Sequence, residues 1–266
     1  MDIVLRVDGL TKSYGRGADA VKVLGGISFE VGQGEFVSVV GPSGCGKTTL
    51  LFAIAGLHSL TSGSVRLKGQ LVTAPPKGVA VVFQDYSRSL FPWKNNRDNV
   101  AFGMARIGGR STSEKRARAE AMLEAVGLGG FGDKYPWQLS GGMQQRVAIA
   151  RALASESELL LLDEPLAAVD AQTRSDMQDL LLDIAIRFRQ TCLLVTHDVD
   201  EAVYMADRVV VLTRRPTTVD HEIKIGLGKK RDQIATRENP VFLKARHDVM
   251  TSIRNFRAAA PVDALA

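Results

Sequence analysis

A glycine-rich loop near the start of the chain contains the residues whose chemistry is most specific. The loop reads Gly41-Pro42-Ser43-Gly44-Cys45-Gly46-Lys47-Thr48-Thr49 and fits the pattern G-x-x-x-x-G-K-[ST]. Its glycines allow a backbone curl in which successive N–H groups point at phosphate oxygens, and the next helix adds partial positive charge. We predict a nucleotide site, with Lys47 at the β- and γ-phosphates and the Thr48 hydroxyl on Mg²⁺. The alternative is a strand–helix turn with an incidental Lys-Thr pair.

The thiol of Cys45 lies inside this loop, beside Lys47 and close to the start of a helix. A neighbouring cation and a helix N-terminus both lower the pKa of a thiol. We therefore expect alkylating agents to inactivate the protein through Cys45, and ATP to protect it.

Two carboxylates end a second apolar segment. Asp163 and Glu164 follow Leu159–Leu162, which predicts a strand buried on both faces. In open α/β sheets, ligands bind at the carboxyl ends of the strands. We predict that Asp163 holds Mg²⁺ through water and that Glu164 orients or deprotonates the water attacking the γ-phosphate. The alternative is an acidic turn that faces solvent.

A third motif combines a helix-capping serine with two glycines. Ser140, Gly141 and Gly142 open a predicted helix, and a bare helix N-terminus offers N–H groups to an anion. Since the first loop already holds the phosphates, this second anion site suggests that a second copy of the chain supplies it. An ordinary serine cap would explain Ser140 but not the glycine pair.

These residues need a scaffold of alternating strands and helices, which implies an α/β core with a parallel sheet. Strands are predicted at Ile3–Val7, Ile27–Val31, Phe36–Val40, Val65–Leu67, Val79–Phe83, Leu159–Leu162, Thr191–Val195 and Arg208–Leu212. Helices are predicted over Lys47–Ala55, from a capping box at Ser111 to Gly127, after Ser140, after Asp170, over Asp198–Ala206 and after Pro240.

The composition is that of a globular chain. It is 45% apolar and 24% charged, with only two cysteines, which argues against disordered, collagen-like and disulfide-framework classes and suits a reducing compartment. No apolar run approaches the roughly 20 residues that span a bilayer, and Met1–Val4 does not resemble a signal peptide. We therefore expect a cytoplasmic chain that does not cross a membrane by itself.

The positive charge is concentrated in the C-terminal tail. Residues 226–266 contain eight Lys or Arg against four Asp or Glu, whereas the whole chain carries a formal net charge of +5. Such a tail could contact nucleic acid or anionic lipid, but we expect a solvated helical appendage.

The motifs occur in an order that resembles the nucleotide-binding subunit of an ATP-binding-cassette (ABC) transporter. They are loop 41–49, Leu139–Arg146, Asp163-Glu164, Asp170 and Thr196-His197-Asp198, and the resemblance covers roughly residues 3–215. It implies a P-loop NTPase core with an antiparallel β subdomain and an inserted helical subdomain. The expected boundaries are 1–225 for the cassette, with its helical subdomain at about 86–155, and 226–266 for a basic extension.

The resemblance also implies roles for single residues. Tyr14 resembles the aromatic that stacks on adenine, and Gln84 the glutamine that senses Mg²⁺ and the attacking water. Ser140, Gly141 and Gly142 resemble the signature loop that closes on the γ-phosphate of the opposite subunit. Asp170 resembles the aspartate that bridges the two sites, and His197 the histidine at the γ-phosphate. Each has a simpler alternative: a packed surface tyrosine, a strand cap or an ordinary loop histidine.

The partners follow from the same resemblance. It implies a head-to-tail homodimer with two ATP and Mg²⁺ sites, attached at the cytoplasmic face of the inner membrane to integral-membrane permease subunits. The predicted dock is the aromatic stretch after Gln84, with Tyr86, Leu90, Phe91, Pro92 and Trp93, although Phe91 and Trp93 could instead pack inside the helical subdomain.

The stretch from Leu90 to Gly103 resembles a narrower group, the ATPases of nitrate, sulfonate and taurine importers. An extracytoplasmic solute-binding protein is then an indirect partner, and no nucleic acid is expected. The alternatives are an exporter or lipid-releasing ATPase with the same chemistry, a DNA-associated ATPase and a ribosome-acting ATPase. Against the last two, no coiled-coil insertion separates Lys47 from Ser140, and the chain holds a single cassette.

Overall fold

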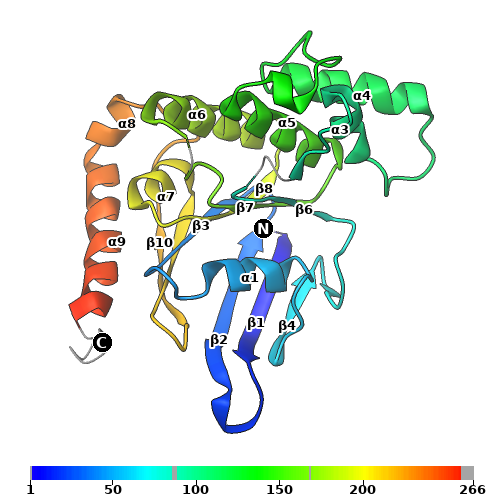
Figure 1. Cartoon of the computed structure of the whole chain (residues 1–266). Coiled ribbons are helices and arrows are strands. Elements are labelled where there is room, and N and C mark those ends of the chain that lie inside the picture. Colours follow the sequence, from blue (N-terminus) through cyan, green and yellow to red (C-terminus); the bar gives the residue numbers. More distant parts are fainter. Residues whose placement is uncertain (1, 86–88, 168, 259–266) are drawn as a thin grey trace. The chain divides into compact units, whose positions relative to one another are not determined.

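The computed structural model describes residues 2–85, 89–167 and 169–258 (Figure 1). The chain forms two compact units, one from Met1–Pro75 with Thr191–Ala266 and the other from Pro76–Gln190. Within the described ranges, no helix combines the length and the apolar character needed to cross a membrane.

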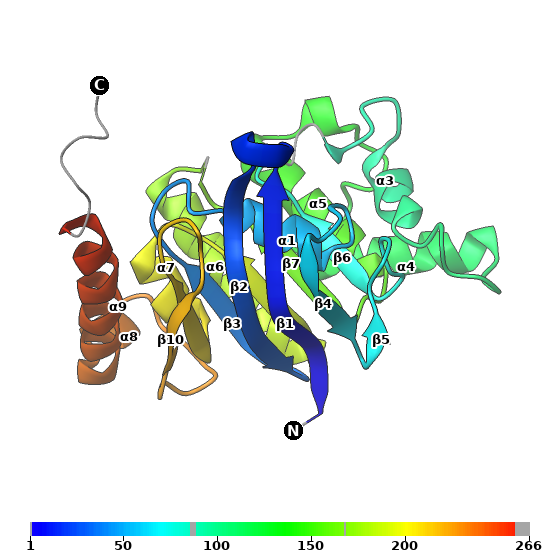
Figure 2. The same cartoon turned by 90° about the horizontal axis from the view of Figure 1, so that it is seen from below.

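The first unit contains an antiparallel sheet with strand order β2-β1-β4-β5, visible as blue and cyan strands in Figure 2. Its strands are β1 Ile3–Tyr14, β2 Val21–Gly32, β4 Ser62–Leu67 and β5 Gln70–Leu71, and the turn η1 Gly17–Asp19 joins the first two. Strands β1 and β2 are longer than predicted. Register shifts interrupt their pairing, one of them around Gly9 at φ +53°, and such bulges let the strands bend and continue.

The same unit contains a mainly parallel sheet. In the order β10-β9-β3-β8, it comprises β3 Phe36–Val40, β8 Thr191–Val195, β9 Arg208–Leu212 and the antiparallel β10 Val219–Lys224. Every residue of β3 and β8 is buried, as their apolar runs predict. Val39 pairs with Val195, so the loops that follow β3 and β8 leave the same edge of the sheet. The helices that follow these loops are α1 Lys47–Ile54 and α7 Val199–Met205.

The C-terminal tail forms α8 Ala235–Glu238 and α9 Pro240–Ala258, and α9 lies along α7 and β9 (Figure 1). The expectation of a solvated appendage is wrong for the described part of this tail. Phe242, Ala245 and Val249 are buried at 5% exposure or less. They recur on one side of α9 at helical spacing, so the helix carries an apolar face that packs.

The second unit pairs β6 Val79–Val82 in parallel with β7 Leu159–Asp163 and adds helices. The helices are α3 Asn96–Phe102, α4 Thr112–Ala125, α5 Gly141–Ala154 and α6 Ala171–Arg187, with the turn η2 Pro136–Gln138. The predicted caps are confirmed: Ser111 forms a capping box with Glu114, and the side chains of Ser140 and Asp170 cap α5 and α6.

Candidate nucleotide-binding site

The phosphate loop curls between β3 and α1 and requires glycine at its last turn. Gly44 and Gly46 have φ of +72° and +109°, a conformation that L side chains rarely adopt. A Cβ on Gly46 would also lie 2.7 Å from Cγ1 of Val23. The curl turns the ammonium of Lys47 back over the loop, where Nζ donates to the carbonyls of Gly41 (3.0 Å) and Pro42 (3.2 Å). Lys47 is therefore held at the loop, where phosphate oxygens can replace these carbonyls.

Two arginines beside this loop were not predicted from the sequence. Arg214 and Arg215 follow β9, are exposed, and line a pocket of about 650 Å³ together with residues 42–45. The hydroxyl of Thr217 donates to the carbonyl of Cys45, which ties the arginine loop to the phosphate loop. The sequence does show an Arg-Arg pair just after a buried strand. It does not show that this strand lies beside β3, because that depends on the strand order of the sheet.

The expectation of a reactive Cys45 thiol is wrong. Cys45 is 2% exposed, and burial raises the pKa of its thiol above the usual value, although nearby Lys47 opposes that shift. The desolvation of a thiolate outweighs a single neighbouring cation here. The Cys45 side chain is therefore a packed part of the loop.

Tyr14 ends strand β1 and remains 41% exposed. Its hydroxyl lies 3.1 Å from Nδ1 of His58, and Nζ of Lys12 lies 5.0 Å from the centre of its ring. These contacts fix the ring while leaving much of its surface accessible. Stacking of adenine on Tyr14 stays a prediction.

His197 lies in a turn that its neighbours hold rigidly. The buried Thr196 hydroxyl donates to the carboxylate of Glu201 and accepts from the N–H of Asp198 (3.1 Å). The Asp198 carboxylate in turn accepts from the N–H of Glu201 (3.1 Å) and caps α7. The side chain of His197 is exposed in the middle of this network, at the same sheet edge as the phosphate loop.

In the second unit, Asp163, Glu164 and Gln84 follow neighbouring strands. Leu162 of β7 pairs with Val82 of β6, so the residues just beyond these positions leave the same edge of the pair. Asp163 is 5% exposed, Glu164 is half-buried and Gln84 is exposed. Glu164 has φ +43°, a strained conformation for a side chain other than glycine, of the kind that concentrates at functional sites.

The signature residues share a pocket of about 550 Å³ with Asp170. Ser140, Gly141 and Gly142 line it together with Thr173, and a Cβ on Gly142 would lie 3.0 Å from Cγ2 of Thr173. The carboxylate of Asp170 accepts from the N–H (3.0 Å) and hydroxyl (2.6 Å) of Thr173. These bonds hold the pKa of Asp170 below its usual value, so the pocket keeps a carboxylate beside the helix N-terminus.

The oxygen donors suit a magnesium ion. Thr48 offers a hydroxyl, Asp163 a carboxylate and Gln84 an amide oxygen, the hard ligands that Mg²⁺ takes alongside water and nucleotide phosphates. In the part of the chain that the structure describes, no group of three or more His, Cys, Asp or Glu side chains could hold a metal ion.

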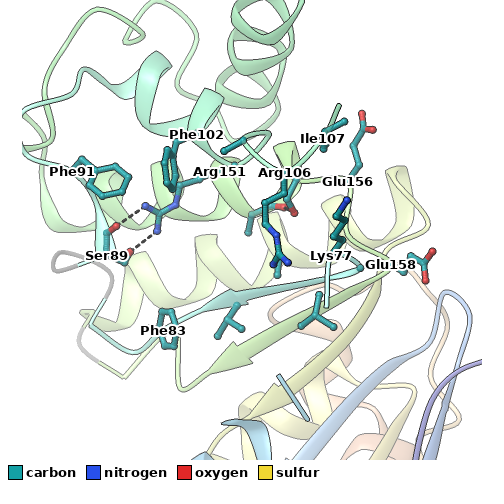
Figure 3. A pocket seen from close by; sticks show the side chains of 18 residues that line it. Lys77, Phe83, Ser89, Phe91, Phe102, Arg106, Ile107, Arg151, Glu156 and Glu158 are labelled. Carbon is teal, nitrogen blue, oxygen red and sulfur yellow. Dashed lines mark hydrogen bonds between the residues drawn. The ribbon is translucent and has the colours of Figure 1, made fainter. Parts of the chain in front are cut away.

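A separate groove of about 770 Å³ lies in the second unit (Figure 3). Phe83, Phe91 and Phe102 contribute aromatic walls, and Phe91 meets Phe102 edge-on at 4.7 Å. The guanidinium of Arg151 donates to the carbonyl (2.5 Å) and hydroxyl (2.9 Å) of Ser89, drawn as dashed lines in Figure 3. Within the predicted dock, Leu90 is buried, Phe91 is half-buried and Trp93 is 71% exposed, whereas Tyr86 lies outside the described residues.

Comparison with known proteins gives consistent matches. The model of the family described as ABC transporter matches residues 24–167. The nitrate import ATP-binding protein NrtD of Synechocystis sp. is 43% identical over 94% of this chain and 95% of its own length. The aliphatic sulfonates import ATP-binding protein SsuB 2 of Burkholderia cenocepacia is 44% identical over 91% and 85%. The bicarbonate transport ATP-binding protein CmpC of Synechococcus elongatus is 43% identical over 94% of this chain, which spans 38% of CmpC.

A solved structure matches as well. The ATP-binding cassette MJ0796, a dimer in a post-hydrolysis state bound to ADP and Pi, has a TM-score of 0.73 and 32% identity. The match covers 84% of this chain and all of that one. The α/β arrangement described above is therefore that of a nucleotide-binding cassette.

Proposed function

Because this chain belongs to the ABC transporter family, as an ATP-hydrolysing subunit, we propose that it powers the import of a small oxyanion through a separate permease. The observation that carries this proposal is the similarity to relatives named for nitrate and sulfonate import, which extends over more than nine-tenths of the chain. The solute would be a small nitrate- or sulfonate-like anion, as the names of these relatives indicate, with taurine added by the resemblance in the stretch from Leu90 to Gly103. The permease, and not this chain, would carry the solute.

The chain's own residues would divide the hydrolytic work as follows. Lys47 and the N–H groups of residues 44–48 bind the β- and γ-phosphates, and Tyr14 supports the adenine. Glu164 accepts a proton from the attacking water, while Gln84 and His197 orient that water and the γ-phosphate. The strained backbone at Glu164 and the rigid turn around His197 support these assignments, because both features fix a side chain at a strand end.

A magnesium ion would be held by Thr48 and Asp163, with Gln84 as its sensor. When bound, the ion neutralises charge on the β- and γ-phosphates. The buried Asp163 carboxylate and the Thr48 hydroxyl are the oxygen donors that fit it.

Two copies of the chain would form a head-to-tail dimer around two ATP molecules. The chain holds one complete phosphate loop and one complete signature pocket, so two copies can build two equivalent sites. The γ-phosphate adds contacts that ADP lacks, so ATP binding would close the pair and hydrolysis would reopen it.

The groove in the second unit would receive a short cytoplasmic helix from the permease. Besides its aromatic walls, the groove is lined by two basic residues, Lys77 and Arg106, and two acidic residues, Glu156 and Glu158. Apolar walls with a polar rim are the usual anatomy of a partner site. The chain would then lie peripherally at the cytoplasmic face of the inner membrane, and a solute-binding protein would contact the permease from outside.

Co-purification tests this function. A tagged Glu164→Gln chain, which should stall with ATP bound, is isolated from native membranes and its partners are identified by mass spectrometry. Recovery of a multi-span permease with an extracytoplasmic binding protein is expected. A permease alone would point to export, and recovery of only soluble partners or nucleic acid would overturn the transport proposal.

A groove variant sharpens that experiment. Phe102 is 49% exposed and lines the groove, so Phe102→Asp should lose the permease while retaining ATP binding. Trp137, 68% exposed and outside the groove lining, provides the matched control Trp137→Asp, which should keep the permease.

A further inference from the structure

Residues 226–258 contact helix α7 at both of its ends, and α7 begins at Val199, two residues after His197. We propose that this C-terminal segment is a brace that positions His197 for ATP hydrolysis. The inference rests on the proposed role of His197 and adds a set of positioning residues to it: Arg231 and Arg246 act through α7 and do not touch the nucleotide.

The brace meets the first turn of α7 through an ion pair. Nε of Arg246 on α9 lies 2.8 Å from Oδ1 of Asp200. Asp200 is adjacent to Glu201, whose carboxylate accepts a hydrogen bond from the Thr196 hydroxyl in the turn that contains His197. A movement of α9 away from α7 would therefore displace Asp200, which lies three residues after His197 in the chain.

The other end of α7 is held by Arg231. Its Nε donates to the carbonyl of Tyr204 (3.0 Å) and its Nη2 to the carbonyl of Ala206 (3.1 Å). The last carbonyls of a helix have no partner within the helix, so one guanidinium satisfies two of these acceptors. The guanidinium of Arg237 also lies 5.0 Å from the centre of the Tyr204 ring.

A third contact links the brace to the strand before the phosphate loop. Nζ of Lys229 lies 2.7 Å from Oδ2 of Asp207, and the same oxygen accepts from the N–H of Phe36 (3.0 Å) at the start of β3. The brace therefore contacts α7 at both ends and is linked to the start of β3 through Asp207. Figures 1 and 2 show α9 running beside α7 in both views.

The buried apolar face of α9 matters because α7 needs packing from other elements to hold its position. Helix α7 has seven residues, too few to be stable alone, so its position must come from tertiary packing. The buried residues Phe242, Ala245 and Val249 belong to α9, the helix that packs against α7 and β9. By contrast, the pocket beside the phosphate loop is lined by residues 42–45 and 214–215, outside the brace. The brace should therefore govern the rate of hydrolysis more than the affinity for ATP.

The test compares arginine variants with matched surface controls. Arg246→Ala is made beside Lys244→Ala, which also removes one charge, and Arg231→Lys is made beside Lys230→Arg, which also keeps one; both lysines are exposed positions of the same segment. We expect kcat per nucleotide-binding site to fall about tenfold in both arginine variants, the scale of a misplaced catalytic group, with KM changed less than about twofold. The lysine controls should match the parent chain.

A second readout follows α7 itself. Hydrogen exchange of the amides in residues 196–206 should accelerate in Arg246→Ala and Arg231→Lys, while exchange in α1 stays unchanged. Normalising kcat to the number of ATP-binding sites removes any effect of an unfolded fraction. If the fall in kcat disappears on normalisation, or if exchange in α7 stays unchanged, the brace is overturned.

A third variant separates this inference from the proposed function. His197→Ala should lower kcat, and adding Arg246→Ala to it should cause no further loss, because the brace acts through His197. Normal kcat in His197→Ala would overturn the role of His197. Reduced kcat in His197→Ala together with normal kcat in Arg246→Ala would overturn the brace alone.

Discussion

At the scale of single residues, backbone strain marks Glu164. Its φ of +43° holds the carboxylate at the end of β7, and Gln at the same position would keep the shape while losing the base. We expect Glu164→Gln to retain ATP affinity and to lose at least about 100-fold in kcat, the usual contribution of a general base. Phosphate release and titration with a fluorescent ATP analogue measure the two quantities.

The chain provides a matched control for this substitution. Glu156 is also a glutamate with positive φ (+52°), and its carboxylate lies at the groove rather than after β7. Glu156→Gln should change kcat by less than about twofold, the effect of a partly exposed ion pair with Arg110. Equal losses in the two variants would show that the fall in kcat does not depend specifically on the Glu164 carboxylate.

Cys45 shows at the same scale what the sequence cannot predict. The neighbours Lys47 and α1 are visible in the sequence and lower a thiol pKa, but burial, which raises it, depends on the packed fold. Because only the thiolate reacts and the raised pKa keeps it scarce at neutral pH, alkylation of the folded chain should be slow and should accelerate as pH rises. Timed labelling at pH 7 and pH 9, read by mass spectrometry, checks this.

The unfolded chain is the reference for that experiment. In urea the thiol loses its burial, so Cys45 should react at the rate of an ordinary exposed cysteine. Labelling of Cys45 in the folded chain at that same rate would contradict the pKa shift. Protection by ATP, expected from the sequence, should be small because the thiol is already covered.

At the scale of elements, the sequence predicted those whose pattern is local. The buried strands Phe36–Val40 and Thr191–Val195 and the caps at Ser111 and Asp170 are confirmed, since apolar runs and capping residues act over a few positions. The full length of β1 depends on bulges in its pairing with β2, which no local pattern shows. The packing of the C-terminal helix needs the surface of α7, supplied by residues far away in the chain.

The phosphate loop was predictable from a local motif, and its last two glycines each have a conformational reason. Gly44 and Gly46 both have positive φ, but only at Gly46 would an added Cβ meet another side chain, Cγ1 of Val23 at 2.7 Å. Gly44→Ala should therefore cost about 1–2 kcal/mol of unfolding free energy from backbone strain alone. Gly46→Ala should cost roughly 1–3 kcal/mol more, as an overpacked site does. Urea unfolding measures both values, and equal costs would show that Val23 yields without penalty.

At the scale of the whole molecule, the proposed head-to-tail pair would account for a chain that carries both a phosphate loop and a signature pocket. The phosphate loop belongs to the first unit and the signature pocket to the second, and each is complete. A loop of successive backbone N–H groups is by itself an anion-binding concavity. The presence of the signature pocket is therefore best explained by a second nucleotide, the one that the other copy binds.

Mixing two inactive chains tests this arrangement of the whole molecule directly. Lys47→Ala removes the loop's ammonium, whereas Gly142→Val overfills the signature pocket, where even an added Cβ would lie 3.0 Å from Cγ2 of Thr173. Each variant alone should hydrolyse almost no ATP. In a head-to-tail pair with one copy of each variant, the intact loop of one copy meets the intact signature of the other.

Mixing should therefore restore up to about a quarter of the parent turnover, because half of the random pairs are mixed and each holds one intact site. If each chain completed its own site, both copies would stay defective and the mixture would remain inactive. Phosphate release from equimolar mixtures, with each variant alone as the control, distinguishes the two outcomes.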